Sequence, residues 1–169
     1  MAMTAEEVRE QMDRATALYK NGEWEAAIDL FSELAIEPEG VQGAEEMHWN
    51  MAMCYAHLDD MEKATQHVGA SGFAISDFHD QFARSKLAQA KALYEQQQWD
   101  AASSAFTHLL ILPGLPADGM EEVHWNIGMC FARLGDWDRA FGHCRSFGGN
   151  ENEFRQTCID AGLNPPNPT

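Results

Sequence analysis

The sequence has few basic residues, no long apolar run and no paired cysteines. Its 11 Lys and Arg residues stand against 27 Asp and Glu residues, which gives a formal net charge of -16. A surface of that sign repels phosphate backbones and anionic membranes, so we expect neither nucleic acid nor a membrane as a partner. The chain also starts without the basic and apolar regions of a secretory signal, and no stretch reaches membrane-spanning length. We therefore predict a cytoplasmic protein.

The cysteines lack the spacing of a metal site. Cys54, Cys130, Cys144 and Cys158 occur singly, without the Cys-x-x-Cys pairs that are typical of zinc ligands. Seven histidines are many for this length, but none falls in a His-x-x-x-His pattern on one helical face. We therefore expect reduced, mostly buried thiols, no disulfide, no metal and no cofactor.

What the sequence does contain is a repeat. The string HWNMAMCYAHL, from His48, returns in the second half as HWNIGMCFARL, from His124. Each half divides again, because a turn residue, an acidic residue, a large apolar residue and then Ala recur at nearly even steps along the chain. The apolar residues of this pattern are Trp24, Met61, Trp99 and Trp137. Units of this length hold two helices each, so we predict helix pairs stacked in series.

Helical periodicity and cap residues support this prediction. The expected helices cover residues 4–20, 24–35, 44–58, 60–69, 80–97, 99–111, 119–134 and 136–146. Thr4 with Glu7 has the pattern of a capping box. A last helix is expected from Asn150 to about Ala161, and its apolar residues Phe154, Cys158 and Ile159 would cover the open end of the stack.

At these residues the chain resembles the tetratricopeptide repeat (TPR) family. The first unit meets the family pattern at Ala15, Leu18, Gly22, Trp24, Ala27, Phe31, Leu34 and Pro38, and the resemblance extends over about residues 8 to 147. It implies an all-α fold, a right-handed superhelical stack of antiparallel helix pairs. We expect one domain over 1–163, with units at about 4–40, 44–72, 78–114 and 118–148, a capping helix at 150–162 and a disordered tail at 164–169. The units exceed the family's usual length of about 34 residues, so the loops between them are expected to be longer.

The resemblance also implies a binding site, because one face of each first helix in this family lines a concave groove. The matching residues are Met12, Thr16, Tyr19, Trp49, Asn50, Met53, Leu87, Lys91, Tyr94, Trp125, Asn126 and Met129. Trp and Tyr often anchor protein contacts, and Met adapts its shape to them. We expect a segment of a partner protein there, basic or amphipathic in view of the acidic charge. The alternative is that neighbouring helices, or the C-terminal helix, bury these side chains.

Three functions follow from the sequence. The first is a non-enzymatic adaptor or scaffold that binds a protein segment, and the second is a dedicated cytosolic chaperone for a secreted or assembly-prone client. The third is an enzyme or metal protein that uses His and Cys side chains. The spacing of His48 and Cys54 argues against it, because six residues along a helix place two side chains about 120° apart. Self-association as a two-fold dimer stays open.

Overall fold

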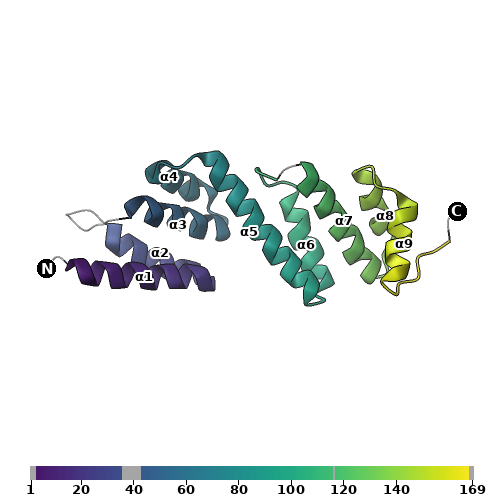
Figure 1. Ribbon diagram of the computed structural model, residues 1–169, viewed down its shortest axis with the longest axis horizontal. Helices are drawn as coiled ribbons and strands as arrows, with labels where there is room; N and C mark the ends of the chain where they lie inside the picture. Colours follow the sequence, from purple (N-terminus) through teal and green to yellow (C-terminus); the bar gives the residue numbers. More distant parts are fainter. Residues whose placement is uncertain (1–2, 36–42, 116, 168–169) are drawn as a thin grey trace. The chain divides into compact units, whose positions relative to one another are not determined.

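The computed structural model describes residues 3–35, 43–115 and 117–167, and all the regular structure in these residues is helical. Figure 1 labels the elements: α1 (Ala5–Asn21), α2 (Trp24–Ala35), α3 (Ala44–His57), α4 (Met61–Ser71), α5 (Ile75–Glu95), α6 (Trp99–Leu109), α7 (Ala117–Arg133), α8 (Trp137–Ser146) and α9 (Glu151–Asp160). The predicted all-α solenoid of tandem helix pairs is confirmed.

Most helix boundaries lie within about two residues of the expected ones, but α5 differs. It begins at Ile75, five residues before the expected start. Phe78 in its first turn is fully buried and meets Trp49 edge-on, with ring centroids 6.0 Å apart. Pro38 and the end of the first predicted unit, at residue 40, lie outside the described residues.

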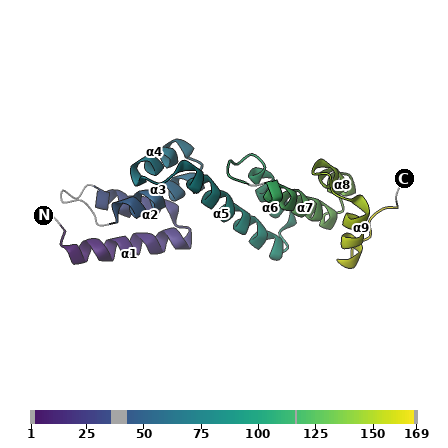
Figure 2. The same ribbon diagram turned by 45° about the horizontal axis from the view of Figure 1, so that its top comes forward.

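The chain forms two compact units, Met1–Phe78 and His79–Thr169, and α5 begins in the first and continues in the second. In the first unit α1 packs against α2, α2 against α3, and α3 against α4. The helices α1 and α2 lie side by side in both ribbon views (Figures 1 and 2). Ala15 and Ala27 are fully buried in this core, where small side chains let the helices approach closely. The expectation of a single domain stays a prediction.

The second unit continues the same arrangement. Its helix α6 packs against α7, α7 against α8, and α8 against α9. In α9 Phe154 and Cys158 are fully buried against α7 and α8, so these two residues cover the last helix pair. Ile159 is 49 % exposed and takes no part in it, because it lies on the outer side of the helix. In the described part of the expected tail, the carbonyl oxygen of Pro166 accepts a hydrogen bond from Arg155 Nη1 of α9, and the disorder of residues 164–169 stays a prediction.

One turn geometry joins the two helices of every pair. Each turn contains a residue with positive φ, namely Gly22 (81°), Asp59 (62°), Gln97 (61°) and Gly135 (79°). The N–H of the following residue donates to the carbonyl five positions earlier, over 2.9 to 3.0 Å in all four turns. This is the hydrogen bond of a Schellman motif, and it satisfies a carbonyl that the end of the first helix leaves free. The repeated sequence pattern around Trp24 therefore encodes a repeated backbone conformation.

Candidate protein-binding surface

The expected groove residues of the first unit divide into two groups. Met12, Thr16 and Tyr19 on α1 and Trp49 on α3 are half-buried, so part of each side chain is exposed. Asn50 and Met53 are only 7 % and 1 % exposed. Their burial gives them a packing role, and we leave them out of the candidate surface.

The second unit shows the same division. Half-buried side chains are Leu87, Lys91, Tyr94, Trp125 and Asn126. Met129 is 5 % exposed, and its Sδ atom lies 3.8 Å from the thiol of Cys158 on α9. Met129 therefore belongs to the core beneath the C-terminal helix.

Aromatic side chains that follow the second helix of the pair cover part of each repeated tryptophan. Trp49 meets Phe73 and Phe78 edge-on at centroid distances of 5.1 and 6.0 Å. Trp125 meets Phe154 of α9 in the same way at 5.2 Å. The step along the chain from Phe78 to Phe154 equals the step from Trp49 to Trp125, so α9 covers Trp125 as the first turns of α5 cover Trp49. The burial that the sequence left open as an alternative thus applies to part of each tryptophan, and both stay half-buried.

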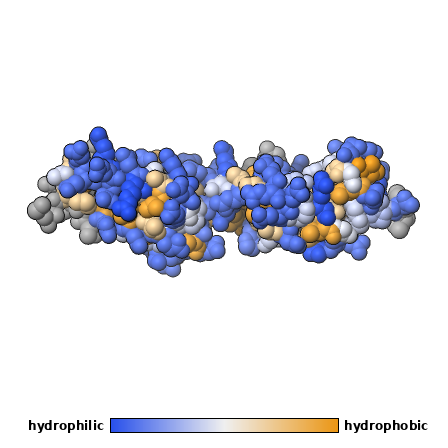
Figure 3. Space-filling model, turned by 90° about the horizontal axis from the view of Figure 1, so that it is seen from below, coloured by the Kyte–Doolittle hydropathy of each residue, from blue (hydrophilic) through white to orange (hydrophobic). Residues whose placement is uncertain are grey.

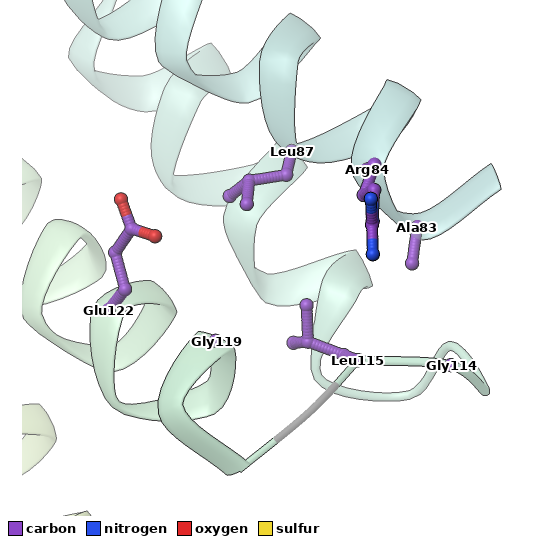
Figure 4. Close-up of a pocket in the computed structure, with 7 residues that line it drawn as sticks. All are labelled: Ala83, Arg84, Leu87, Gly114, Leu115, Gly119 and Glu122. Carbon is purple, nitrogen blue, oxygen red and sulfur yellow. The ribbon is translucent and has the colours of Figure 1, made fainter. Parts of the chain in front are cut away.

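A cleft of about 210 Å³ lies beside Leu87 in the second unit. Its lining consists of Ala83, Arg84, Leu87, Gly114, Leu115, Gly119 and Glu122. Figure 4 shows Arg84 and Leu87 extending from α5, Leu115 rising toward α5 from the loop before α7, and Glu122 extending from α7. An apolar floor therefore has a charged side chain at either end.

Gly114 holds the loop side of this cleft in place. Its φ is 90°, and a Cβ atom there would lie 2.6 Å from the backbone carbon of His79. Only glycine permits that approach, because any side chain would collide with the backbone of α5. The contact fixes Leu115 opposite Leu87.

The two charged ends of the cleft differ. Lys91 Nζ lies 2.5 Å from Glu122 Oε1, so the carboxylate of Glu122 is already compensated. Arg84 is exposed, and it has no hydrogen bond or ion pair with any other described residue. The cleft thus joins a small apolar surface to the guanidinium group of Arg84. Elsewhere, the face drawn in Figure 3 is mostly hydrophilic, with hydrophobic residues in separate patches.

The cysteines lie in the core. Burial raises the pKa of Cys54 and of Cys130 to about 12 and also raises the pKa of Cys144 and Cys158. All four thiols are free. In the parts of the chain that the structure describes, no three His, Cys, Asp or Glu side chains come together as metal ligands.

Two histidine pairs were missed by the sequence analysis. His48 and His67 approach each other through their Nδ1 atoms at 3.1 Å, and His124 and His143 do the same at 3.1 Å. The signal was present, because the separation of the two partners along the chain is the same in both copies. Such a separation across a turn could not be interpreted before the pairing of the helices was known.

Tandem helix pairs with half-buried aromatic side chains on their first helices define a helical-repeat protein. A family model described as Tetratricopeptide repeat matches residues 12–68 and 87–147. These two regions make up more than half of the chain, which therefore belongs to the tetratricopeptide repeat family. Members of this family bind protein partners and are typically non-enzymatic interaction modules.

Two further comparisons add detail. The chain is similar to a solved structure described as MamA AMB-1 P212121, with 13% sequence identity and a TM-score of 0.37, over 88% of this chain and 92% of that one. No curated protein matches the chain. Within the described ranges, no helix combines the length and apolar character needed to cross a membrane.

Proposed function

We propose that this chain is a non-enzymatic adaptor that binds an amphipathic segment of a partner protein, and that the cleft beside Leu87 receives one apolar side chain of that segment. The cleft is the observation that supports this most. It opens between two first helices of the repeat, and the apolar side chains of Leu87 and Leu115 line it. A recess lined in this way can receive one anchoring side chain.

The charges around the cleft suggest how a segment is oriented. Arg84 is available at one end to donate hydrogen bonds to a carboxylate or a backbone carbonyl of the segment. The net charge of -16 attracts basic residues over a longer range. A segment with an apolar anchor, an acceptor beside it and basic residues further away fits both features.

The buried thiols support the non-enzymatic part of the proposal. A cysteine nucleophile reacts as the thiolate, and burial has raised the pKa values of Cys54 and Cys130 to about 12. A histidine would therefore have no ionised thiol to activate in this core.

The test is a binding experiment with a matched control. Peptides selected on the full chain from a random library are titrated calorimetrically against the wild type, Leu87→Glu and Ala88→Glu. Position 88 is exposed on the same helix and lies outside the cleft lining, so both variants add the same charge. We expect Leu87→Glu to weaken binding by about tenfold or more, because the anchor must then bury a carboxylate, and Ala88→Glu to change it little. Equal affinities for the two variants would remove the cleft from the binding site.

The chaperone function makes a different prediction for the same partner. A dedicated chaperone keeps an assembly-prone client soluble, whereas an adaptor leaves the solubility of its partner unchanged. Expression of the identified partner with and without this chain, followed by fractionation, distinguishes the two functions.

A further inference from the structure

The two histidine pairs join the two helices of every second helix pair. Each pair links the first helix of a unit to its second helix, α3 to α4 and α7 to α8, through facing Nδ1 atoms. The ring centroids are 5.2 Å apart in one pair and 5.4 Å in the other. In the first and third of the four helix pairs, the corresponding positions hold Gln11 with Leu30 and Lys86 with Ala105. The histidine contact is therefore a feature of the second and fourth helix pairs.

The chemistry of the contact limits how many protons a pair can hold. Two Nδ1 atoms at 3.1 Å share a hydrogen bond only if one of them carries a proton and the other has a free lone pair. A neutral pair therefore contains one ring protonated on Nδ1 and one protonated on Nε2. One added proton keeps the bond, because an imidazolium Nδ1–H can still donate to the neutral ring. A second added proton leaves two donors and two positive charges facing each other, and the contact becomes repulsive.

No hydrogen bond or ion pair joins the first pair to a carboxylate of the described residues. Tyr55 on α3 stacks against His67 at a centroid distance of 5.3 Å, and Lys63 on α4 lies over the Tyr55 ring at 5.1 Å. The carboxylate of Asp60 is engaged by Lys63 at 2.9 Å. Burial lowers the pKa of His67, and the neighbouring His48 lowers it further.

The second pair has equivalent surroundings. Phe131 on α7 stacks against His143 at a centroid distance of 5.7 Å. Arg139 on α8 lies over the Phe131 ring at 4.2 Å, and its Nε atom forms an ion pair with Asp136 at 2.6 Å. Burial lowers the pKa of His124. Burial also lowers the pKa of His143, and His124 and Arg139 lower it further.

The paired helices carry other acidic residues, among them Glu45 and Glu121, which precede His48 and His124 by three residues at exposed positions. Among the described residues, no carboxylate offsets the lowered pKa of His67, His124 or His143. Positive charge on the pairs is thus opposed by burial and by the second ring.

We propose that the two histidine pairs are acid-sensitive clips, which hold α3 against α4 and α7 against α8 while at most one ring of a pair is protonated, and which release when both are. The unfolded chain binds protons with the ordinary histidine pKa of about 6.5, more readily than the folded pairs. The stability that the clips contribute is therefore complete above that pH and is lost as the pH falls below it.

Urea unfolding followed by circular dichroism, from about pH 7.5 to about pH 5 in the presence of EDTA, tests the clips. The chains compared are the wild type, the double variant His67→Gln/His143→Gln and the control His108→Gln, which removes an exposed histidine of α6. We expect the wild type and the control to lose stability on acidification, and the double variant to take up about two protons fewer on unfolding. The comparison uses the slope with pH, so a constant destabilisation by glutamine does not affect it. Parallel slopes for the wild type and the double variant would overturn the proposal.

A second measurement uses the unmodified chain. Nitrogen-15 NMR distinguishes the two neutral tautomers of histidine, and at about pH 7.5 we expect one Nδ1–H ring and one Nε2–H ring in each pair. If both rings of a pair are Nε2–H, the facing Nδ1 lone pairs cannot share a hydrogen bond, and the clip does not exist.

Discussion

At the scale of single residues, burial decides the reactivity of the cysteines. Cys54 and Cys130 are fully buried, and their pKa values of about 12 leave almost no thiolate near neutral pH. We expect none of the four thiols to react with Ellman's reagent at about pH 8 in the native protein, and all four to react in concentrated guanidinium chloride. The absorbance of the released thionitrobenzoate measures both. Stoichiometric reaction of the native chain would show that the core around α3 or α7 opens.

Burial of individual residues was also the least predictable property of the candidate surface. The spacing of Trp49 and Met53 places both on one face of a helix. In the structure Met53 is almost completely buried, whereas Trp49 is only half-buried. Helical periodicity gives the direction of a side chain and says nothing of how far the next helix extends over it. Leu115 was missed for another reason. It lies in a loop, and its place opposite Leu87 depends on the close approach of Gly114 to α5.

At the scale of elements, one turn inside a helix pair holds a residue in an unfavourable backbone conformation, which a substitution can relieve. Gln97 has a φ of 61°, a conformation that glycine adopts freely and glutamine does not. We expect Gln97→Gly to raise the free energy of unfolding by about 1 kcal/mol, as judged by urea denaturation. Asp59→Gly is the matched comparison, with a smaller gain, because Asp tolerates positive φ better than Gln does. Destabilisation by Gln97→Gly would mean that the glutamine side chain stabilises the turn more than its backbone strain costs.

The helices themselves could be predicted well because their ends are encoded locally. The capping box at Thr4 forms as expected, with the Thr4 N–H donating to Glu7 over 2.7 Å and the Glu7 N–H donating to Thr4 Oγ1 over 3.2 Å. Gly22 and Gly135 end their helices in the left-handed conformation that glycine favours. The start of α5 was predicted five residues too late, because what fixes it is the long-range burial of Phe78.

At the scale of the whole molecule, α9 is expected to stabilise the second unit strongly. Phe154 is fully buried between α7 and α8, whereas Ile159 on the same helix is 49 % exposed. We expect Phe154→Ala to lower the free energy of unfolding by about 3–5 kcal/mol, since it empties a packed site. Ile159→Ala serves as the control and should cost less than about 1 kcal/mol. Urea denaturation measures both, and a similar small cost for the two variants would show that α9 is not required to cover the stack.

The repeat made the architecture predictable, whereas the function depends on features that the repeat does not specify. The regular period, with its helical periodicity and recurring small residues, predicted helix pairs packed in series, and the resemblance to the tetratricopeptide repeat family implied the superhelical stack. The cleft and the histidine pairs depend on positions where the units differ. The shift that aligns the two halves places Glu39 at the position of Gly114, and the positions of the paired histidines hold other residues in the first and third helix pairs.

The correspondence between Phe154 and Phe78 bears on how such an array can grow. The same aromatic residue, present once in each half, docks against Trp49 at an internal junction and against Trp125 beneath the last helix. The contact that α7 makes beneath α9 thus repeats the contact between Trp49 of α3 and the first turn of α5. Lengthening the array would call for no new kind of interface, only for another copy of the stretch from 78 to 153 inserted directly before Phe154.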